Sequence, residues 1–219
     1  MKHLLTLLFV LFVWAIFPAD EAHSQVEAGR FALGLTVSAV TSTEGSMLGD
    51  KIEVARVSMP EVSLTYFISE AFSVELSHGR YETTLESRNG NFDYGDLEVS
   101  PTRLALEYRH NFGTPRPFWD VSSAYFAMGA DYFSTDFKTS DEARSALGAP
   151  DLDISFKNSM GGHFGAGMDL FLARFLAFNL DGKVWFSNSE AKLKGVPVPD
   201  KSDFSLNAYS VGAGFKVMF

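Results

Sequence analysis

The chain ends in Tyr209-Ser210-Val211-Gly212-Ala213-Gly214-Phe215-Lys216-Val217-Met218-Phe219. The odd positions of this segment are all apolar, whereas most even positions are small or polar. This period of two predicts a β-strand with one apolar face. A long, half-apolar strand with a free edge invites aggregation in a soluble protein. A strand that closes a barrel inside a lipid bilayer has no free edge, so the segment favours a membrane barrel.

The first 24 residues are typical of an export signal. An almost unbroken apolar run over 4–17 follows a short polar start, and small residues precede Gln25. This run is shorter than the roughly 20 residues that a transmembrane helix needs. We therefore expect a signal peptide over 1–24 and one barrel domain over 25–219. The alternative is an uncleaved membrane anchor.

The composition excludes several classes of protein. The chain of 219 residues has no cysteine, so an exported form must be stable without disulfides. Its net charge of −9 argues against nucleic acid as a partner. Twenty-one phenylalanines suit both strands and lipid-facing surfaces. Hydropathy is uninformative here, because lipid-facing and lumen-facing residues alternate in a membrane barrel.

Alternating segments recur along the whole mature chain. The expected strands are 31–39, 62–67, 72–81, 103–112, 118–132, 155–171, 176–186 and 204–219. The connectors alternate between long polar ones, 40–59, 82–100, 133–154 and 187–203, and short ones near 68–71, 113–117 and 173–175. Outer-membrane barrels have this asymmetry, with long loops outside and short turns in the periplasm. The pattern predicts an all-β fold, an eight-stranded antiparallel up-and-down transmembrane β-barrel.

Two further features concern individual strands. Aromatic residues gather beside the short connectors, as expected for a ring at the lipid headgroups: Tyr66, Phe67, Phe72, Phe112, Phe118, Trp119, Phe171, Phe175 and Phe178. In the fifth strand, Asp120 and Asp131 fall on opposite faces, and a bulge would reconcile them. The face assignment of that strand stays open.

The chain resembles the small bacterial outer-membrane β-barrels of the OmpA-transmembrane-domain and OmpX type. Gly214, Val217 and Phe219 fit the carboxy-terminal assembly signal of that family, although Gly212 stands where a polar residue is usual. The resemblance implies recognition by the barrel-assembly machinery and localisation in the outer membrane of a Gram-negative bacterium. It also implies surroundings of outer-membrane lipid and lipopolysaccharide. We expect a monomer.

The inward face of the predicted barrel carries a lumen charge network. Its members are Glu75, Arg103, Glu107, Arg109, His163, Asp169, Asp181, Lys183 and Lys216. An eight-stranded barrel is just wide enough for its own side chains, so opposite charges can pair across it. Pairing Leu172 with Leu176 at the turn places Trp185 opposite His163. The two interpretations are a plug of ion pairs and a narrow or gated polar path.

The sequence offers little for an enzyme. A serine acyl-transfer site needs a nucleophile and a base within hydrogen-bond reach, but His78, His110 and His163 have no such partner on the same strand face. There is no Gly-x-Ser-x-Gly motif. We expect no catalytic site, cofactor or metal, and interpret the acidic residues of 141–153 as solvating a loop.

The main functional hypothesis is a structural or surface-interaction role. The extracellular loops would contact an external ligand, while the lumen stays filled by side chains. The alternatives are a narrow channel for small or hydrophobic solutes and a lipid A-modifying enzyme. A soluble lipocalin-like barrel is a further alternative, since alternation by itself does not distinguish inside from outside.

Overall fold

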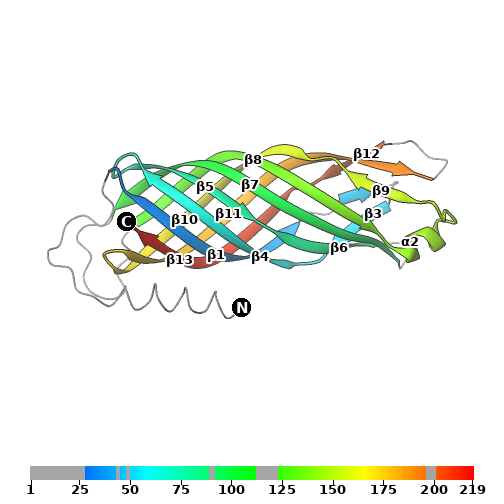
Figure 1. The fold of residues 1–219 in the computed structure, drawn as a ribbon, viewed down its shortest axis with the longest axis horizontal. Coiled ribbons are helices and arrows are strands. Elements are labelled where there is room, and N and C mark those ends of the chain that lie inside the picture. Colours follow the sequence, from blue (N-terminus) through cyan, green and yellow to red (C-terminus); the bar gives the residue numbers. More distant parts are fainter. Residues whose placement is uncertain (1–27, 43–44, 48–49, 89–91, 112–122, 196–200) are drawn as a thin grey trace.

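The computed structural model describes residues 28–42, 45–47, 50–88, 92–111, 123–195 and 201–219. They form a long antiparallel barrel with a short helix at the end opposite the C-terminus (Figure 1). The expected signal peptide over 1–24 lies outside the described residues. In the described part of the chain, no helix has the length and apolar character needed to cross a membrane.

The barrel is closed by ladders between neighbouring strands. The elements are β1 (Phe31–Ser42), β2 (Gly45–Met47), β3 (Asp50–Val54), β4 (Val57–Phe67), β5 (Phe72–Gly79), β6 (Tyr81–Ser87), β7 (Asp93–Asn111), β8 (Ser123–Thr139), α2 (Asp141–Ala146), β9 (Asp153–Phe156), β10 (Ser159–Ala173), β11 (Leu176–Lys194), β12 (Lys201–Ser205) and β13 (Ala208–Met218). The ladders run β1–β4–β5–β7–β8–β10–β11–β13 and return to β1. This closed circle of eight antiparallel strands confirms the predicted fold.

The apolar face of each strand points outward. On β13, Val211 and Phe215 are 66% and 50% exposed, whereas Lys216 is 2% exposed. The other strands contribute further exposed apolar side chains, among them Leu33, Leu35, Leu64, Leu76, Leu104, Leu106, Phe126, Phe164 and Val184. A belt of this kind is stable only against lipid, so the outward direction of the apolar face is confirmed and the lipocalin-like alternative is wrong.

The strands are longer than the apolar pattern predicts. β7 and β11 have 19 residues each, about twice the 9 to 11 residues that cross a bilayer. The expected loops over 82–100 and 187–203 are largely strand, and so are most described residues of 40–59 and part of 133–154. The wall extends beyond the lipid, where outward side chains are polar. The alternation continues there with its faces exchanged, because apolar side chains such as Leu85 and Leu97 point into the lumen.

The end near the C-terminus is closed by apolar side chains. Phe67 and Phe171 are buried together with Met218 and two alanines. The prediction that these two phenylalanines belong to the lipid-facing aromatic ring is wrong, because both stand at strand positions whose side chains point into the barrel. Tyr66 and Phe72 are exposed beside the same turn. Phe112, Phe118 and Trp119 lie outside the described residues.

The strand registers agree with the sequence except near one turn. His163 pairs with Trp185, as predicted. At the turn itself the register shifts, so that Ala173 and not Leu172 faces Leu176. β8 pairs with β7 without a register shift over its described length, so the bulge expected in the fifth strand is absent from Ser123–Thr139. Asp131 faces inward, and Asp120 is outside the described residues.

Candidate functional site: the two halves of the lumen

Arg109 on β7 is the centre of a charged cluster in the lower lumen, the half nearer the C-terminus. Its guanidinium lies 2.6 Å from Glu107 Oε2 and 2.5 Å from Asp169 Oδ2. The Arg109 Nε donates a hydrogen bond of 2.9 Å to Ser73 Oγ. The guanidinium carbon also lies 4.7 Å from the centre of the Tyr125 ring. The arginine therefore joins side chains that come from four strands, β5, β7, β8 and β10.

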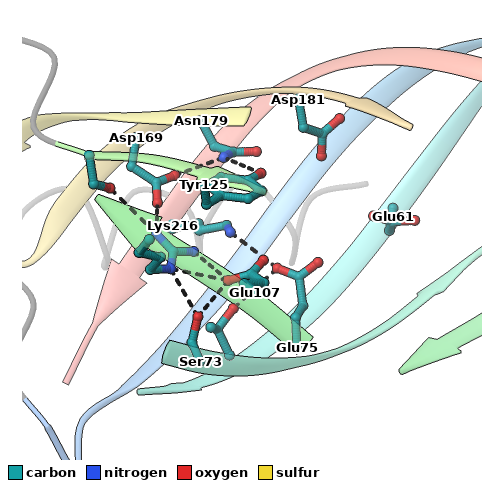
Figure 2. A network of polar contacts seen from close by, with 12 residues as sticks. Glu61, Ser73, Glu75, Glu107, Tyr125, Asp169, Asn179, Asp181 and Lys216 are labelled. Carbon is teal, nitrogen blue, oxygen red and sulfur yellow. Dashed lines mark hydrogen bonds and ion pairs between the residues drawn. The ribbon is translucent and has the colours of Figure 1, made fainter. Parts of the chain in front are cut away.

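Lys216 and Asn179 complete this lower cluster (Figure 2). The Lys216 ammonium lies 3.1 Å from Glu75 Oε2 and 5.0 Å from the Tyr125 ring centre. Asn179 Nδ2 donates to Asp169 Oδ1 at 2.7 Å and to the Tyr125 hydroxyl at 3.0 Å. Burying charge is unfavourable unless each group is paired and hydrogen-bonded. The cluster meets that condition by linking β5, β7, β8, β10, β11 and β13.

A second charged layer lies farther from the C-terminus and is organised around Glu61 on β4. This carboxylate forms an ion pair with Arg103 and a second one, of 2.6 Å, with Lys183. Lys183 also lies 3.2 Å from Asp181 Oδ2. The Arg103 guanidinium carbon is 4.5 Å from the centre of the Trp185 ring, which is fully buried. Arg103 thus has charged partners on one side and an aromatic face on another.

His163 and Asp131 extend this upper layer. His163 Nδ1 is 2.7 Å from Asp131 Oδ1, and Arg103 Nε is 3.7 Å from the same oxygen. A Cβ atom at Gly129 would lie 2.6 Å from His163 Cε1, which real Cβ contacts do not show. Glycine at this position therefore makes room for the imidazole.

All nine side chains expected in the lumen are at most 7% exposed. The structure divides them between two clusters, with Glu75, Glu107, Arg109, Asp169 and Lys216 below, and Arg103, His163, Asp181 and Lys183 above. The sequence reasoning missed Glu61, Asp131, Tyr125 and Asn179. Glu61 has the inward parity of its strand but precedes the apolar run. The parity of Asp131 was ambiguous.

The lower lumen is filled by these side chains. The cavity between the two clusters has a volume of about 10 Å³ and is lined by residues of both, including Glu75 and Arg103. Such a volume holds about one water molecule. Within the described ranges, no three acidic or histidine side chains are placed to hold a metal ion.

The upper lumen, on the far side of Arg103 and Trp185, is apolar. Its buried core contains Val40, Ile52, Met59, Tyr81, Leu85, Tyr94, Leu97, Val99, Phe133, Leu152, Ile154, Phe156, Leu193, Phe204 and Leu206. Phe156 packs edge-on against both Phe137 and Phe204, with ring centres 5.1 Å apart in each pair. The lumen therefore changes from charged to apolar along its length.

The helix α2 lies at the end of this apolar half that is farther from the C-terminus (Figure 1). Its N-cap is Ser140, whose Oγ accepts a hydrogen bond of 2.9 Å from Ala143 N. Ala143 is fully buried and belongs to the apolar core. The amide of Ile154 is bound by Thr139 Oγ1 at 3.1 Å. The helix α2 and the start of β9 thus pack against the apolar core at this end.

The barrel wall is weaker in two places around the upper lumen. On the side of β4 that faces β6, Val57–Pro60 take part in no ladder among the described residues, and the Arg80 amide donates a 3.4 Å hydrogen bond to Pro60 O across that gap. Between β8 and β9, side chains such as Thr139 replace a ladder. The first gap lies beside Met59, next to the charged layer.

The C-terminal strand closes the circle against β1. Phe219 and Phe31 exchange two backbone hydrogen bonds of 2.9 and 3.0 Å. The Phe219 side chain is 64% exposed, and its ring stacks on Phe31 with 6.2 Å between centres. A Cβ atom at Gly214 would collide with the backbone of β1. Glycine at this position allows the two strands to approach.

The model of the OmpW family matches residues 26–217. The chain belongs to the OmpW family. Among solved structures, the outer membrane protein OprG from Pseudomonas aeruginosa matches with 18% identity over 90% of this chain and 99% of that one, with a TM-score of 0.73. The outer membrane protein AlkL matches with 16% identity over 93% and 95% of the two chains, with a TM-score of 0.61. At these identities the structural likeness shows the fold.

Membership in the OmpW family refines the expected resemblance. A small bacterial outer-membrane barrel is the correct class, and the bacterial outer membrane is its location. The family is OmpW, however, and not the OmpA or OmpX type, whose motifs are too short to separate these barrels. Neisserial surface protein A is also similar, with 12% identity over 91% of this chain and all of that one, and a TM-score of 0.52. A comparison with curated protein sequences found no match.

Proposed function

We propose that this OmpW-family barrel is a narrow conduit for small hydrophobic solutes. Such molecules are admitted at the extracellular end, held in the apolar upper lumen, and released sideways through the wall at the outer edge of the apolar belt. The observation that carries the proposal is the boundary at Arg103 and Trp185, where the apolar core ends and the charged layer begins. This proposal replaces the surface-interaction role as the main hypothesis.

The energetics favour the upper lumen over a path through the whole barrel. An apolar solute that buries 200 Å² there gains about 5 kcal/mol from its removal from water. To continue downward, the solute would have to separate ion pairs such as Lys183–Glu61. Breaking each pair leaves a buried, unpaired charge, which costs about 3–5 kcal/mol. Release through the wall avoids this cost.

The gap between β4 and β6 is the proposed exit. It lies immediately above the charged layer, because Met59 borders it and is 3.9 Å from an Arg103 nitrogen. The register of β4 with β5 pairs Glu61 with Gly79, and its continuation places Ser58 opposite Glu82. Strands without a ladder separate at a lower cost than paired ones.

A reversible cross-link tests this exit. The chain has no cysteine, so Ser58→Cys with Glu82→Cys can be oxidised without competing thiols. The control pair is Glu98→Cys with Asp136→Cys, which spans an intact ladder. The assay is the rate of fluorescence increase of N-phenyl-1-naphthylamine in cells with and without the protein. We expect oxidation to slow uptake in the first pair, reduction to restore it, and the control pair to remain unchanged. Equal uptake in the oxidised and reduced first pair would refute the exit.

A surface-interaction role has one observation in its favour. An open groove of about 560 Å³ lies beside α2, and Asp93, Asp96, Lys138 and Arg144 are among its lining residues. Its mixed charges fit a polar ligand outside the cell. Binding of external ligands by whole cells, compared between wild type and Lys138→Glu, tests this second function. Identical binding by both would remove it.

We also propose the expected processing and assembly of the chain. Residues 1–24 act as a signal peptide, and 25–219 form the mature, monomeric domain in contact with lipopolysaccharide. Gly214, Val217 and Phe219 form the signal read by the barrel-assembly machinery. The exposure of Phe219 at the end of the closing strand supports this role. Phe219→Ser should reduce the folded protein recovered from outer membranes, measured by heat-dependent migration on a denaturing gel.

A further inference from the structure

We propose that the upper lumen selects apolar molecules that carry one uncharged oxygen group, such as aliphatic alcohols, and that the Thr83 hydroxyl is their polar contact. This inference rests on the proposed conduit function and narrows its substrate class. Thr83 lies on β6, between Tyr81 and Leu85, which both belong to the apolar core.

The Thr83 hydroxyl has no hydrogen-bond partner among the described residues, although the residue is only 4% exposed. It lines a cavity of about 10 Å³, whose other lining residues are mostly apolar, among them Tyr81, Leu97 and Phe204, together with Ser42 and Ser205. This volume accommodates about one oxygen atom of a water molecule or of a ligand. An unpaired polar group thus faces a space of matching size inside an apolar compartment.

A buried, unpaired hydroxyl is unfavourable, and valine has the same shape without that penalty. The neighbouring Thr84 shows the contrast, because it points outward and its Oγ1 donates a hydrogen bond of 2.9 Å to Asp96. In the lower lumen, Thr65 likewise donates to Glu75 at 3.1 Å. Packing and strand propensity therefore explain a β-branched side chain at position 83, but they do not explain its hydroxyl.

The chemistry of the lumen favours an uncharged oxygen group. A threonine hydroxyl can both donate to and accept from an alcohol, and it can donate to a ketone or aldehyde. An anionic head group is disfavoured, because buried carboxylates outnumber buried basic side chains in the described lumen: Glu61, Glu75, Glu107, Asp131, Asp169 and Asp181 against Arg103, Arg109, Lys183 and Lys216. The apolar part of the ligand would lie against side chains such as Phe204.

Competing uptake of two deuterated probes tests the proposal. Cells with and without the full-length protein receive 1-octanol and n-octane, and mass spectrometry gives the protein-dependent rate for each. Thr83→Val should lower the octanol-to-octane ratio about fivefold, the usual effect of one lost hydrogen bond. Thr83→Ser should retain the ratio. Thr84→Val, a matched loss of a hydroxyl on the outer face, should leave it at the wild-type value.

The outcomes separate this inference from the conduit function. If both probes enter through the protein and Thr83→Val leaves their ratio unchanged, the selectivity of Thr83 is refuted while the conduit stands. If neither probe enters faster with the wild-type protein than without it, the conduit itself is refuted, and the inference falls with it. Heat-dependent gel migration verifies that each variant is folded.

Discussion

Removal of Arg109 should destabilise the barrel more than removal of any exposed ion pair. In Arg109→Met, Glu107 and Asp169 lose the guanidinium that lies 2.6 and 2.5 Å away. One unpaired buried carboxylate costs about 3–5 kcal/mol. Protonation limits this cost, since neutralising a carboxyl group of pKa near 4 at pH 7 takes roughly 4 kcal/mol. For two carboxylates we expect a loss of about 6–8 kcal/mol in the free energy of unfolding.

Equilibrium unfolding by urea in lipid vesicles measures this loss. Combining Arg109→Met with Glu107→Gln and Asp169→Asn should recover more than half of it, because the triple variant buries no unpaired charge. The exposed pair Arg80–Glu98 provides the contrast, and Arg80→Met should cost about 1 kcal/mol or less. If Arg109→Met unfolds within about 1 kcal/mol of the wild type, the lower cluster does not stabilise the barrel as argued.

Four further predictions concern other parts of the barrel. In planar bilayers the wild-type protein should conduct little ion current, and Lys183→Gly should increase this current by opening the upper charged layer. Equal currents through the wild type and the variant would contradict a filled lumen. Leu97→Lys should abolish protein-dependent uptake of N-phenyl-1-naphthylamine by charging the apolar core, and undiminished uptake would count against the conduit. Thr139→Val should accelerate hydrogen exchange of the Ile154 amide, as measured by mass spectrometry. An unchanged exchange rate would show that this hydrogen bond does not protect the amide. Burial raises the pKa of Tyr81, in the wall beyond the lipid, to about 12. The unfolded chain then loses this proton first, so about 2–3 kcal/mol of stability should disappear as pH rises from 10 to 12, and Tyr81→Phe should abolish this loss.

The apolar alternation of the strands was sufficient to predict the membrane-facing half. Residues such as Leu104 and Leu106 recur with a period of two, and that period fixes which side chains share a face. The pairing of His163 with Trp185 was predicted from the short turn near 173–175, and it holds although the register at the turn itself is shifted by one residue. The pattern was insufficient above the lipid, because there the apolar side chains, such as Leu85 and Leu97, lie on the inward face and the polar ones on the outward face.

The charged clusters were predicted only in part. Parity places Glu75, Arg109 and Lys216 inside, but it does not say which of them meet. Lys216 and Glu75 are 141 positions apart and pair because the barrel closes and its strands are staggered. Glu61, which joins two basic side chains, was missed because its strand begins before the apolar run. Pairing across a lumen depends on strand tilt and stagger, and neither is visible in a single strand.

The sequence by itself determined that this chain forms a barrel with an apolar outer surface, because the alternation of apolar and polar residues is a local property of each strand. The tertiary structure decided that the lumen has two different halves. Tyr81, Leu97, Phe156 and Phe204 come from four separate strands and form an apolar core only when the extended wall brings them together. The boundary at Arg103 has the same origin, since its partners lie on strands that meet across the closed lumen.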